Sequence, residues 1–333
     1  MVSSLDPERR VLLVCHAGSD IGIGHLSRML SLAAALIGAE VRLLIHGDSV
    51  VRDDLAEFDH TFVDLDTDLL DAVGEHSADL APSVVVFDLH PKLLPDDFAT
   101  RSAVLRQTGV RLVGVDSLLE ECASLDITWV PSLVVDAEAV AECKGTVYSG
   151  WDSFLITRRL PVEDWSPGSK VLVLTGGSDV TSQHTTLPTL LDQQLPDRSR
   201  ISWVRGPFAG APALPEEPRH EWLVHESPSG LDELIQGADY AITVFGVTLF
   251  ELLQYGVPTV VFSPYDDRRV PELDPVAAAG AAVVADDAST AVGALSSLMT
   301  DDLHAAQLSN VARGRMQVNG AERLAGLIHS LDE

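Results

Sequence analysis

The sequence predicts an α/β protein made of two doubly wound, Rossmann-like domains that face one another across a cleft. Short apolar strands alternate with helical periods in both halves, which is typical of parallel sheets covered by helices. The alternation breaks at residues 160–168, where two prolines, a glycine and a lack of periodicity indicate a linker. A chain of 333 residues also favours two domains over one. We therefore expect domains over residues 1–158 and 159–333.

The first domain is expected to begin with a buried strand at residues 11–15 and a loop over 16–24. An amphipathic helix follows, because apolar residues recur at helical spacing from Leu26 to Ile37. Further short, apolar strands are predicted at 41–45, 84–87 and 112–115. Ligands of such sheets bind beyond the carboxyl ends of the strands, so residues at those ends are the candidates for a site.

The second domain is expected to begin with a strand at 171–174. Later strands are predicted at 201–204, 222–224, 240–244 and 259–262. Residues 206–219 hold four prolines and are expected to form an exposed loop, whereas the chain from Ser289 onward has a helical pattern.

Charge and composition exclude several classes of protein. Fifty acidic side chains against 22 basic ones give a net charge of −28, and such a surface would repel the phosphates of a nucleic acid. No apolar run approaches the ~20 residues that span a bilayer. The three cysteines are too few for a disulfide scaffold. We expect a cytoplasmic protein from a reducing compartment, with no membrane span.

The excess of acidic residues and the scarcity of lysine also bear on the environment in which the protein works. Only three of the basic residues are lysines. An acidic, lysine-poor surface suits solvent of high ionic strength, where salt screens self-repulsion, and this predicts a halophilic source. The alternative is a GC-rich genome that prefers arginine codons.

The first candidate motif, Gly22-Ile23-Gly24-His25, lies between the first strand and the first helix. Its glycines allow a tight turn and close approach to a ligand. They place His25 in the first helical turn, where the helix dipole disfavours the imidazolium form. A neutral histidine there can accept a proton near pH 7, as a general base must. The alternative is a surface histidine beside a glycine-rich connection.

The second motif, Gly176-Gly177-Ser178-Asp179, directly follows a predicted strand. Free N–H groups and a following helix would suit a diphosphate. The motif is neither a Walker loop nor a dinucleotide fingerprint. Ser178 or Asp179 as a plain helix cap is the alternative, and both interpretations can hold together.

The third motif spans residues 245–253 and includes Gly246. Thr248 with Glu251 three residues later predicts a capping box. A functional role is the other interpretation, in which the two oxygens of Glu251 accept hydrogen bonds from both hydroxyls of a ribose.

Three polar residues close strands in the first half, namely Asp88, His90 and Asp116. All should point toward the same cleft as His25. Ligation of a metal by His25, Asp88 and His90 has no recognisable motif behind it, so we expect no metal. These side chains are expected to position water or substrate, or to satisfy strand ends.

Taken in order, these segments resemble a known family. The similarity runs through residues 21–28, Asp88, Asp116, residues 155–158, the Gly176–Asp179 motif and residues 248–258. It points to the UDP-sugar hydrolases of pseudaminic acid biosynthesis and the related spore-coat polysaccharide proteins. These are GT-B-fold relatives of the peptidoglycan N-acetylglucosaminyltransferase, and the resemblance covers most of the chain.

The resemblance implies a reaction and a role for each motif. His25 would activate water for attack on the anomeric carbon C1, with Asp88 orienting the sugar or that water. UDP would leave with C1–O cleavage and inversion, from a diacetamido-trideoxy type of sugar, without metal or cofactor. The first domain would bind the sugar or acceptor and the second the nucleotide. The implied substrate-side residues are Gly22, Gly24, Arg28, His90 and Asp116, and the implied nucleotide-side residues are Gly176, Gly177, Ser178, Asp179, Gly246, Thr248 and Glu251.

The chain departs from the family pattern mainly on the sugar side. His16 stands where an aspartate is usual, His90 where a tyrosine is usual, and Val130-Pro131-Ser132 where the family is rich in asparagine. In the second half Asp266-Asp267 replaces an Asn-Gln pair. Two alternatives to hydrolysis therefore stay open: a GT-B glycosyltransferase that uses the same UDP site and His25, and a catalytically silent nucleotide-binding relative. A sugar-nucleotide epimerase of the same fold is a third, minor one.

Overall fold

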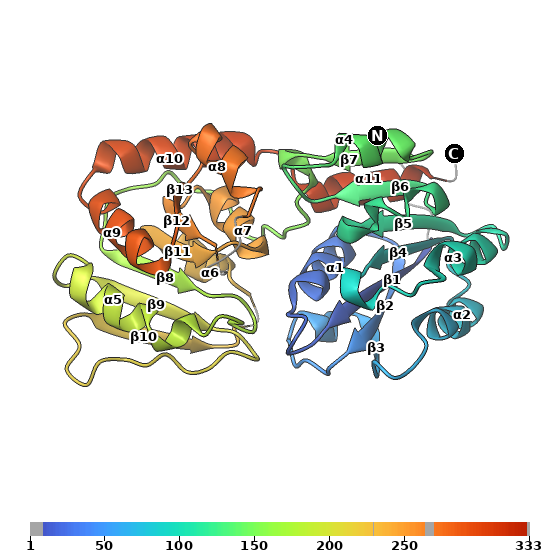
Figure 1. The fold of residues 1–333 in the computed structure, drawn as a ribbon, viewed down its shortest axis with the longest axis horizontal. Helices are drawn as coiled ribbons and strands as arrows, with labels where there is room; N and C mark the ends of the chain where they lie inside the picture. Colours follow the sequence, from blue (N-terminus) through green and yellow to red (C-terminus); the bar gives the residue numbers. More distant parts are fainter. Residues whose placement is uncertain (1–8, 229, 264–269, 332–333) are drawn as a thin grey trace. The chain divides into compact units, whose positions relative to one another are not determined.

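The computed structural model describes residues 9–228, 230–263 and 270–331 (Figure 1). Asp266 and Asp267 lie outside the described residues. The chain forms two compact units. The first runs through Thr157 and takes in the chain again from Val318, and the second is Arg158–Gln317.

The first unit is a seven-stranded parallel sheet in the order β3-β2-β1-β4-β5-β6-β7. Helices α2 and α3 cover one face, where their apolar side chains pack on β1, β4 and β5 in one core cluster. Helix α1 packs on β1 and against α11. The strands are β1 (Arg10–Ala17), β2 (Glu40–Gly47), β3 (Asp59–Val63), β4 (Val84–Asp88), β5 (Arg111–Val115), β6 (Ile127–Val130) and β7 (Thr146–Ser149). The helices are α1 (Gly24–Ala35), α2 (Leu69–Leu80), α3 (Phe98–Arg106), α4 (Ala137–Glu142) and α11 (Gly320–Ser330).

The second unit is a six-stranded parallel sheet in the order β10-β9-β8-β11-β12-β13. Helices α5, α9 and α10 join the larger core cluster and α6 and α7 the smaller one. The strands are β8 (Lys170–Leu174), β9 (Arg200–Arg205), β10 (Glu221–Glu226), β11 (Tyr240–Val244), β12 (Thr259–Phe262) and β13 (Val283–Ala285). The helices are α5 (Leu187–Gln194), α6 (Asp232–Gln236), α7 (Val247–Tyr255), α8 (Leu273–Ala279), α9 (Ala288–Leu298) and α10 (Asp302–Arg315).

All the strands that the sequence predicts are present. The described part of the chain holds four more that were not anticipated, β3, β6, β7 and β13, and all four are five residues or shorter. The loop at 206–219 and the linker at 160–168 hold no helix or strand, as expected. Within the described ranges, no helix is long and apolar enough to cross a membrane.

The last helix differs from its sequence assignment. The sequence predicts a second domain that runs to residue 333, but α11 packs in the first unit. Gly320 allows this contact, because a Cβ there would lie 2.4 Å from the Phe154 carbonyl oxygen. Arg323 forms an ion pair with Asp152, and its guanidinium lies 5.7 Å from the ring centre of Trp129. The buried apolar face of α11 completes the attachment.

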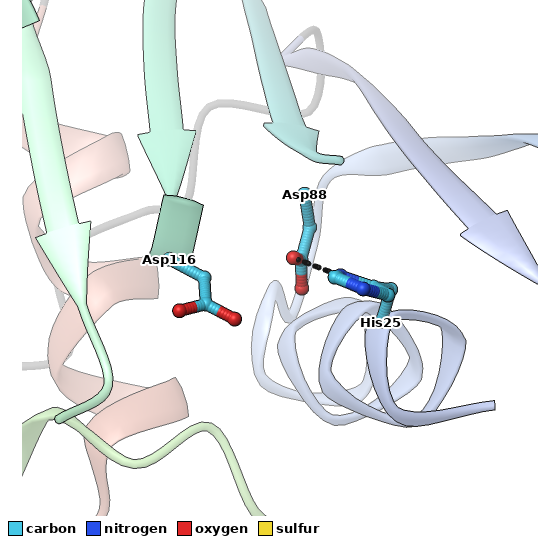
Figure 2. Close-up of side chains that lie close together, drawn as sticks. All are labelled: His25, Asp88 and Asp116. Atoms are coloured by element: carbon cyan, nitrogen blue, oxygen red, sulfur yellow. Dashed lines mark hydrogen bonds and ion pairs between the residues drawn. The ribbon is translucent and has the colours of Figure 1, made fainter. Parts of the chain in front are cut away.

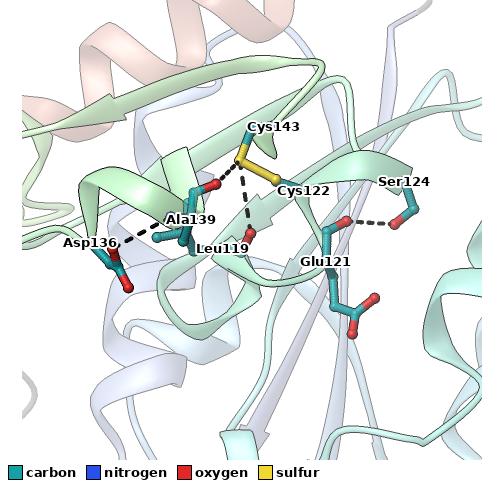
Figure 3. The surroundings of a disulfide bond; sticks show 7 residues. All are labelled: Leu119, Glu121, Cys122, Ser124, Asp136, Ala139 and Cys143. Atoms are coloured by element: carbon teal, nitrogen blue, oxygen red, sulfur yellow. Dashed lines mark hydrogen bonds between the residues drawn. A yellow bond between two sulfur atoms is a disulfide. The ribbon is translucent and has the colours of Figure 1, made fainter. Parts of the chain in front are cut away.

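A disulfide joins Cys122, in the connection between β5 and β6, to Cys143, which follows α4 (Figure 3). Cys15 is a buried free thiol on β1. The number of cysteines in the sequence does not predict this bond, because the pairing depends on two connections that only the fold brings together. The bond is also unlike the reducing compartment expected from composition.

Candidate functional site

The polar residues of the first unit gather where neighbouring parallel strands end. Cys15 on β1 pairs in register with Asp88 on β4, and Asp88 pairs with Val115 on β5. Asp88 is thus the last residue of its strand, and Asp116 follows β5 directly. Helix α1 begins at Gly24, so His25 lies in its first turn, where the sequence places it. Figure 2 shows His25, Asp88 and Asp116 converging at this edge.

His25 and Asp88 form a hydrogen-bonded pair. The His25 Nδ1 atom lies 2.7 Å from the Asp88 Oδ1 atom, and both residues are buried. An ionised carboxylate only accepts hydrogen bonds, so the Nδ1 atom carries the proton in this pair. The Nε2 atom of a neutral His25 then has a free lone pair, which is the requirement for a base.

The start of α1 is not the only source of charge near His25, because the buried Asp88 carboxylate lies beside its ring. Arg28, one turn further along α1, compensates much of that charge. The charge at this edge of the sheet therefore depends on the His25–Asp88 pair and on the Arg28 guanidinium, and not on the helix terminus alone.

Arg28 is the hub of the cluster. Its Nε and Nη2 atoms donate to the two oxygens of Asp88 at 2.7 and 2.8 Å, and Nη2 also donates to the Asp116 Oδ2 atom at 2.7 Å. Burial alone would raise the pKa of the Asp88 carboxyl, but Arg28 and His25 outweigh it and lower that pKa to about 2. Asp88 is therefore ionised at neutral pH, which keeps the proton of His25 on Nδ1.

The positions of His25, Asp88 and Asp116 resemble a metal site. One possible ligand atom from each lies within 4.8 Å of the others. However, the Nη2 atom of Arg28 lies 2.9 Å from His25 Nδ1 and contacts both carboxylates. A guanidinium thus supplies the positive charge that a metal ion would bring, so these residues do not fit a metal as they are arranged.

Asp116 reaches Arg28 from an unusual backbone conformation. Its φ is +64°, in the left-handed region that non-glycine residues seldom adopt. Such conformations cost on the order of 1–3 kcal/mol and cluster at functional sites. The side chain is 39% exposed, so one face of this carboxylate is open to a ligand.

Three further histidines line the same edge. His16, the second-last residue of β1, lies in register with His46, the second-last residue of β2. The ring of His90 lies edge-on to that of His25, with 5.9 Å between ring centres. His46 was missed in the sequence, since it lies just beyond the end of the predicted strand. Gly22, which has a φ of +84°, turns the chain between β1 and α1.

The 175–179 loop of the second unit differs from its expected form. No α-helix follows it directly, because α5 begins only at Leu187. The Asp179 carboxylate is buried and accepts hydrogen bonds from the N–H groups of Gln183 and His184 and from His184 Nδ1. Asp179 is thus engaged within the loop as a cap, and its expected contact with a diphosphate is not supported. The expected helix dipole is missing as well, because no α-helix directly follows the loop.

Gly176 and Gly177 nevertheless leave their backbone open to close approach by other groups. Gly176 has a φ of +89°, and a Cβ there would meet no atom within 4 Å. Gly177 lies against Gly206, whose Cβ would approach its backbone to 2.4 Å. The Oγ1 atom of Thr175 at the start of this loop is buried and has no hydrogen-bond partner among the described residues. Ser178 is half-buried in the same loop.

The predicted capping box at Thr248 and Glu251 is wrong. Helix α7 begins at Val247 with Gly246 as N-cap, and no side chain caps it. Thr248 is already the second helical residue, so Glu251 lies too far along to reach back to a cap. Two residues thus separate the end of β11 from the start of helix α7, and no side-chain hydrogen bond among the described residues caps the helix.

Comparisons with known proteins identify the fold. No protein-family model matches the chain, and no curated protein matches it. Solved structures do match. MurG of Acinetobacter baumannii is 16% identical, with a TM-score of 0.61, over 97% of this chain and 100% of its own. The spinosyn forosaminyltransferase SpnP is also 16% identical, with a TM-score of 0.66, over 98% of this chain and 100% of its own.

A third similar structure was solved with a ligand. The UDP-GlcNAc 2-epimerase from Neisseria meningitidis, bound to UDP-GlcNAc, is 12% identical, with a TM-score of 0.59, over 97% of this chain and 100% of its own. At such low identities the likeness establishes the fold alone. It confirms the expected α/β fold of two Rossmann-like units of the GT-B type.

Proposed function

We propose that this protein is a nucleotide-sugar hydrolase that releases UDP by attack of water on C1 of the sugar. The observation that carries the proposal is the contact of 2.7 Å between His25 Nδ1 and Asp88 Oδ1 at the carboxyl edge of the first sheet. With the proton on Nδ1, the Nε2 atom of a neutral His25 is the acceptor that the reaction needs. The family resemblance of the sequence supports UDP as the nucleotide. Structural likeness to an epimerase solved with UDP-GlcNAc supports it too.

The chemistry follows from the proton positions. His25 Nε2 takes a proton from water as its oxygen forms a bond to C1, while the C1–O bond to UDP breaks with inversion. Asp88 holds the other proton of the ring and stabilises the imidazolium that forms, because Arg28 keeps it ionised. The released sugar carries the water oxygen, and UDP leaves with the bonding electrons.

The second unit is assigned the nucleotide in this proposal. The uncapped start of α7, at Gly246 and Thr248, offers N–H groups to the diphosphate, and Gly176 and Gly177 allow close backbone approach. Glu251 is assigned the ribose hydroxyls. Departure of UDP is favoured because these groups stabilise the charge that develops on it.

UDP release from a panel of UDP-sugars without acceptor tests the proposal. The panel includes a diacetamido-trideoxy sugar nucleotide, and the assay is run in low and in molar KCl because of the acidic surface. We expect release by the wild type and a loss of roughly 10²-fold or more in His25→Ala. His304→Ala, at an exposed position in α10, is the matched control and should keep wild-type activity. No release by a wild type that binds UDP overturns hydrolysis.

A glycosyltransferase is the second candidate, favoured by the likeness to the forosaminyltransferase. The same base would then deprotonate an acceptor hydroxyl instead of water. A transferase turns over rapidly only when acceptor is added, whereas the hydrolase needs none. A silent relative would bind UDP and show no turnover under either condition.

A further inference from the structure

We infer that His16 is a positioning residue that holds His90 as a hydrogen-bond donor beside the base His25. This inference rests on the proposed function. In that reaction His90 donates from its Nε2–H to an oxygen of the sugar, such as a hydroxyl or an acetamido carbonyl. Neither role follows from the family pattern, since both histidines are places where this chain departs from it.

A chain of hydrogen bonds gives each buried ring one tautomer. The backbone N–H of His90 donates to His16 Nδ1 at 2.9 Å, so the proton of neutral His16 is on Nε2. That Nε2 lies 3.2 Å from His46 Nδ1 and therefore donates to it. His46 in turn carries its proton on Nε2, which donates to the Thr67 carbonyl oxygen at 3.1 Å. Every link has one donor and one acceptor.

The hydrogen-bonded histidines His16 and His46 lie within the sheet. His16 is fully buried and His46 nearly so, and the two occupy register positions on neighbouring strands. Burial, followed by the nearby His46, His25 and His90, lowers the pKa of His16 to about 3, against the opposing effect of Asp88. His16 thus stays neutral near pH 7, and its acceptor atom is always available to the His90 backbone.

A hydrogen bond within its own loop fixes the tautomer of His90. Its Nδ1 atom accepts from the Lys92 N–H at 3.2 Å, which leaves the ring proton on Nε2. Burial, followed by the neighbouring His25 and Lys92, lowers the pKa of His90, and Asp116 opposes them. The site edge therefore presents an acceptor, His25 Nε2, and a donor, His90 Nε2–H, on adjoining rings.

Two substitutions of His16 separate the effect of its hydrogen-bond acceptor from the effect of its size. In His16→Asn, the side-chain oxygen takes the place of Nδ1 and still accepts from the His90 N–H. In His16→Phe, the acceptor is lost and the backbone N–H is left unpaired. We expect His16→Phe to raise KM for the sugar nucleotide about tenfold with a smaller change in kcat, and His16→Asn to restore most of that loss. His60→Phe on β3 is the control for loss of a histidine in the same sheet.

Imidazole nitrogen NMR gives a readout independent of turnover. In the wild type, His90 should show a protonated Nε2 and His25 a protonated Nδ1, and His16→Phe should disturb the His90 signals while those of His60 stay unchanged. If the wild type releases no UDP, the proposed function fails, and NMR still tests the hydrogen-bond chain. If the wild type is active and His16→Phe matches it in KM and in the His90 signals, the positioning role is overturned. Equal losses in His16→Phe and His16→Asn overturn it as well.

Discussion

Replacing Asp88 by asparagine removes the charge that organises the first unit's sheet edge. The carboxylate accepts hydrogen bonds from His25 Nδ1 and from two nitrogens of Arg28, and it is fully buried. An asparagine fits the same space but is neutral. It also offers an NH₂ group toward His25, which would move the ring proton to Nε2 and turn the base into a donor.

The size of the effect follows from the pKa and the burial. Asp88 has its pKa lowered from 3.8 to about 2, which contributes about 2 kcal/mol to stability at neutral pH. Because the folded-state pKa is the lower one, this contribution is present above about pH 4 and is lost as the pH falls toward about 2. The substitution would also leave the largely buried Arg28 with Asp116 alone, and breaking a buried ion pair costs about 3–5 kcal/mol. We expect Asp88→Asn to lose about 3 kcal/mol of stability, at the lower end of that range because Asp116 remains as a partner.

Urea unfolding at pH 7 and UDP release are the assays. Besides the lower stability, we expect UDP release to fall by roughly 10²–10⁴-fold, because the tautomer of His25 is wrong for a base. Asp116→Asn is the matched control, since it removes a partly exposed charge from the same arginine and leaves the His25 pair intact. An Asp88→Asn variant with wild-type stability and UDP release would refute this reasoning.

Three other outcomes follow from the structure. Reduction of the Cys122–Cys143 bond, which closes a loop between residues 21 apart, should lower the free energy of unfolding by about 3 kcal/mol, and a double Cys→Ala variant should no longer respond to reductant in urea melts. Gly206→Ala should weaken UDP binding in calorimetry, because its Cβ would collide with Gly177; unchanged affinity contradicts this. Between pH 6 and 4, wild-type stability should fall more steeply than that of His16→Phe, by up to about 1.4 kcal/mol per pH unit, since only the unfolded chain protonates His16 there; parallel curves contradict it.

The strands and the meeting of Asp88 with Asp116 could be predicted from the sequence. Runs of buried β-branched residues identify central parallel strands, and the carboxyl ends of such strands share one edge. Residues that close them therefore come together even when they are far apart in the chain. His25 followed from the same logic, because the first helix begins at that edge.

Other features depend on contacts that no local pattern contains. The family resemblance assigns Arg28 to the substrate side, but its ion pairs with partners 60 and 88 residues away make it a structural hub. The docking of α11 on the first unit depends on Gly320 meeting Phe154. The start of α7 was misplaced by a short distance, because Gly246 serves as the N-cap in place of a side chain. Tertiary packing decides each of these.

The source of the oxygen on the released sugar tests the central claim most directly. The wild type is allowed to react with its UDP-sugar in ¹⁸O-labelled water, and the UDP is analysed by mass spectrometry. Attack of water on C1, with His25 as base, predicts UDP without label and a sugar that carries it. Label in the phosphate of UDP or a sugar phosphate product would show cleavage at phosphorus, and would contradict the account.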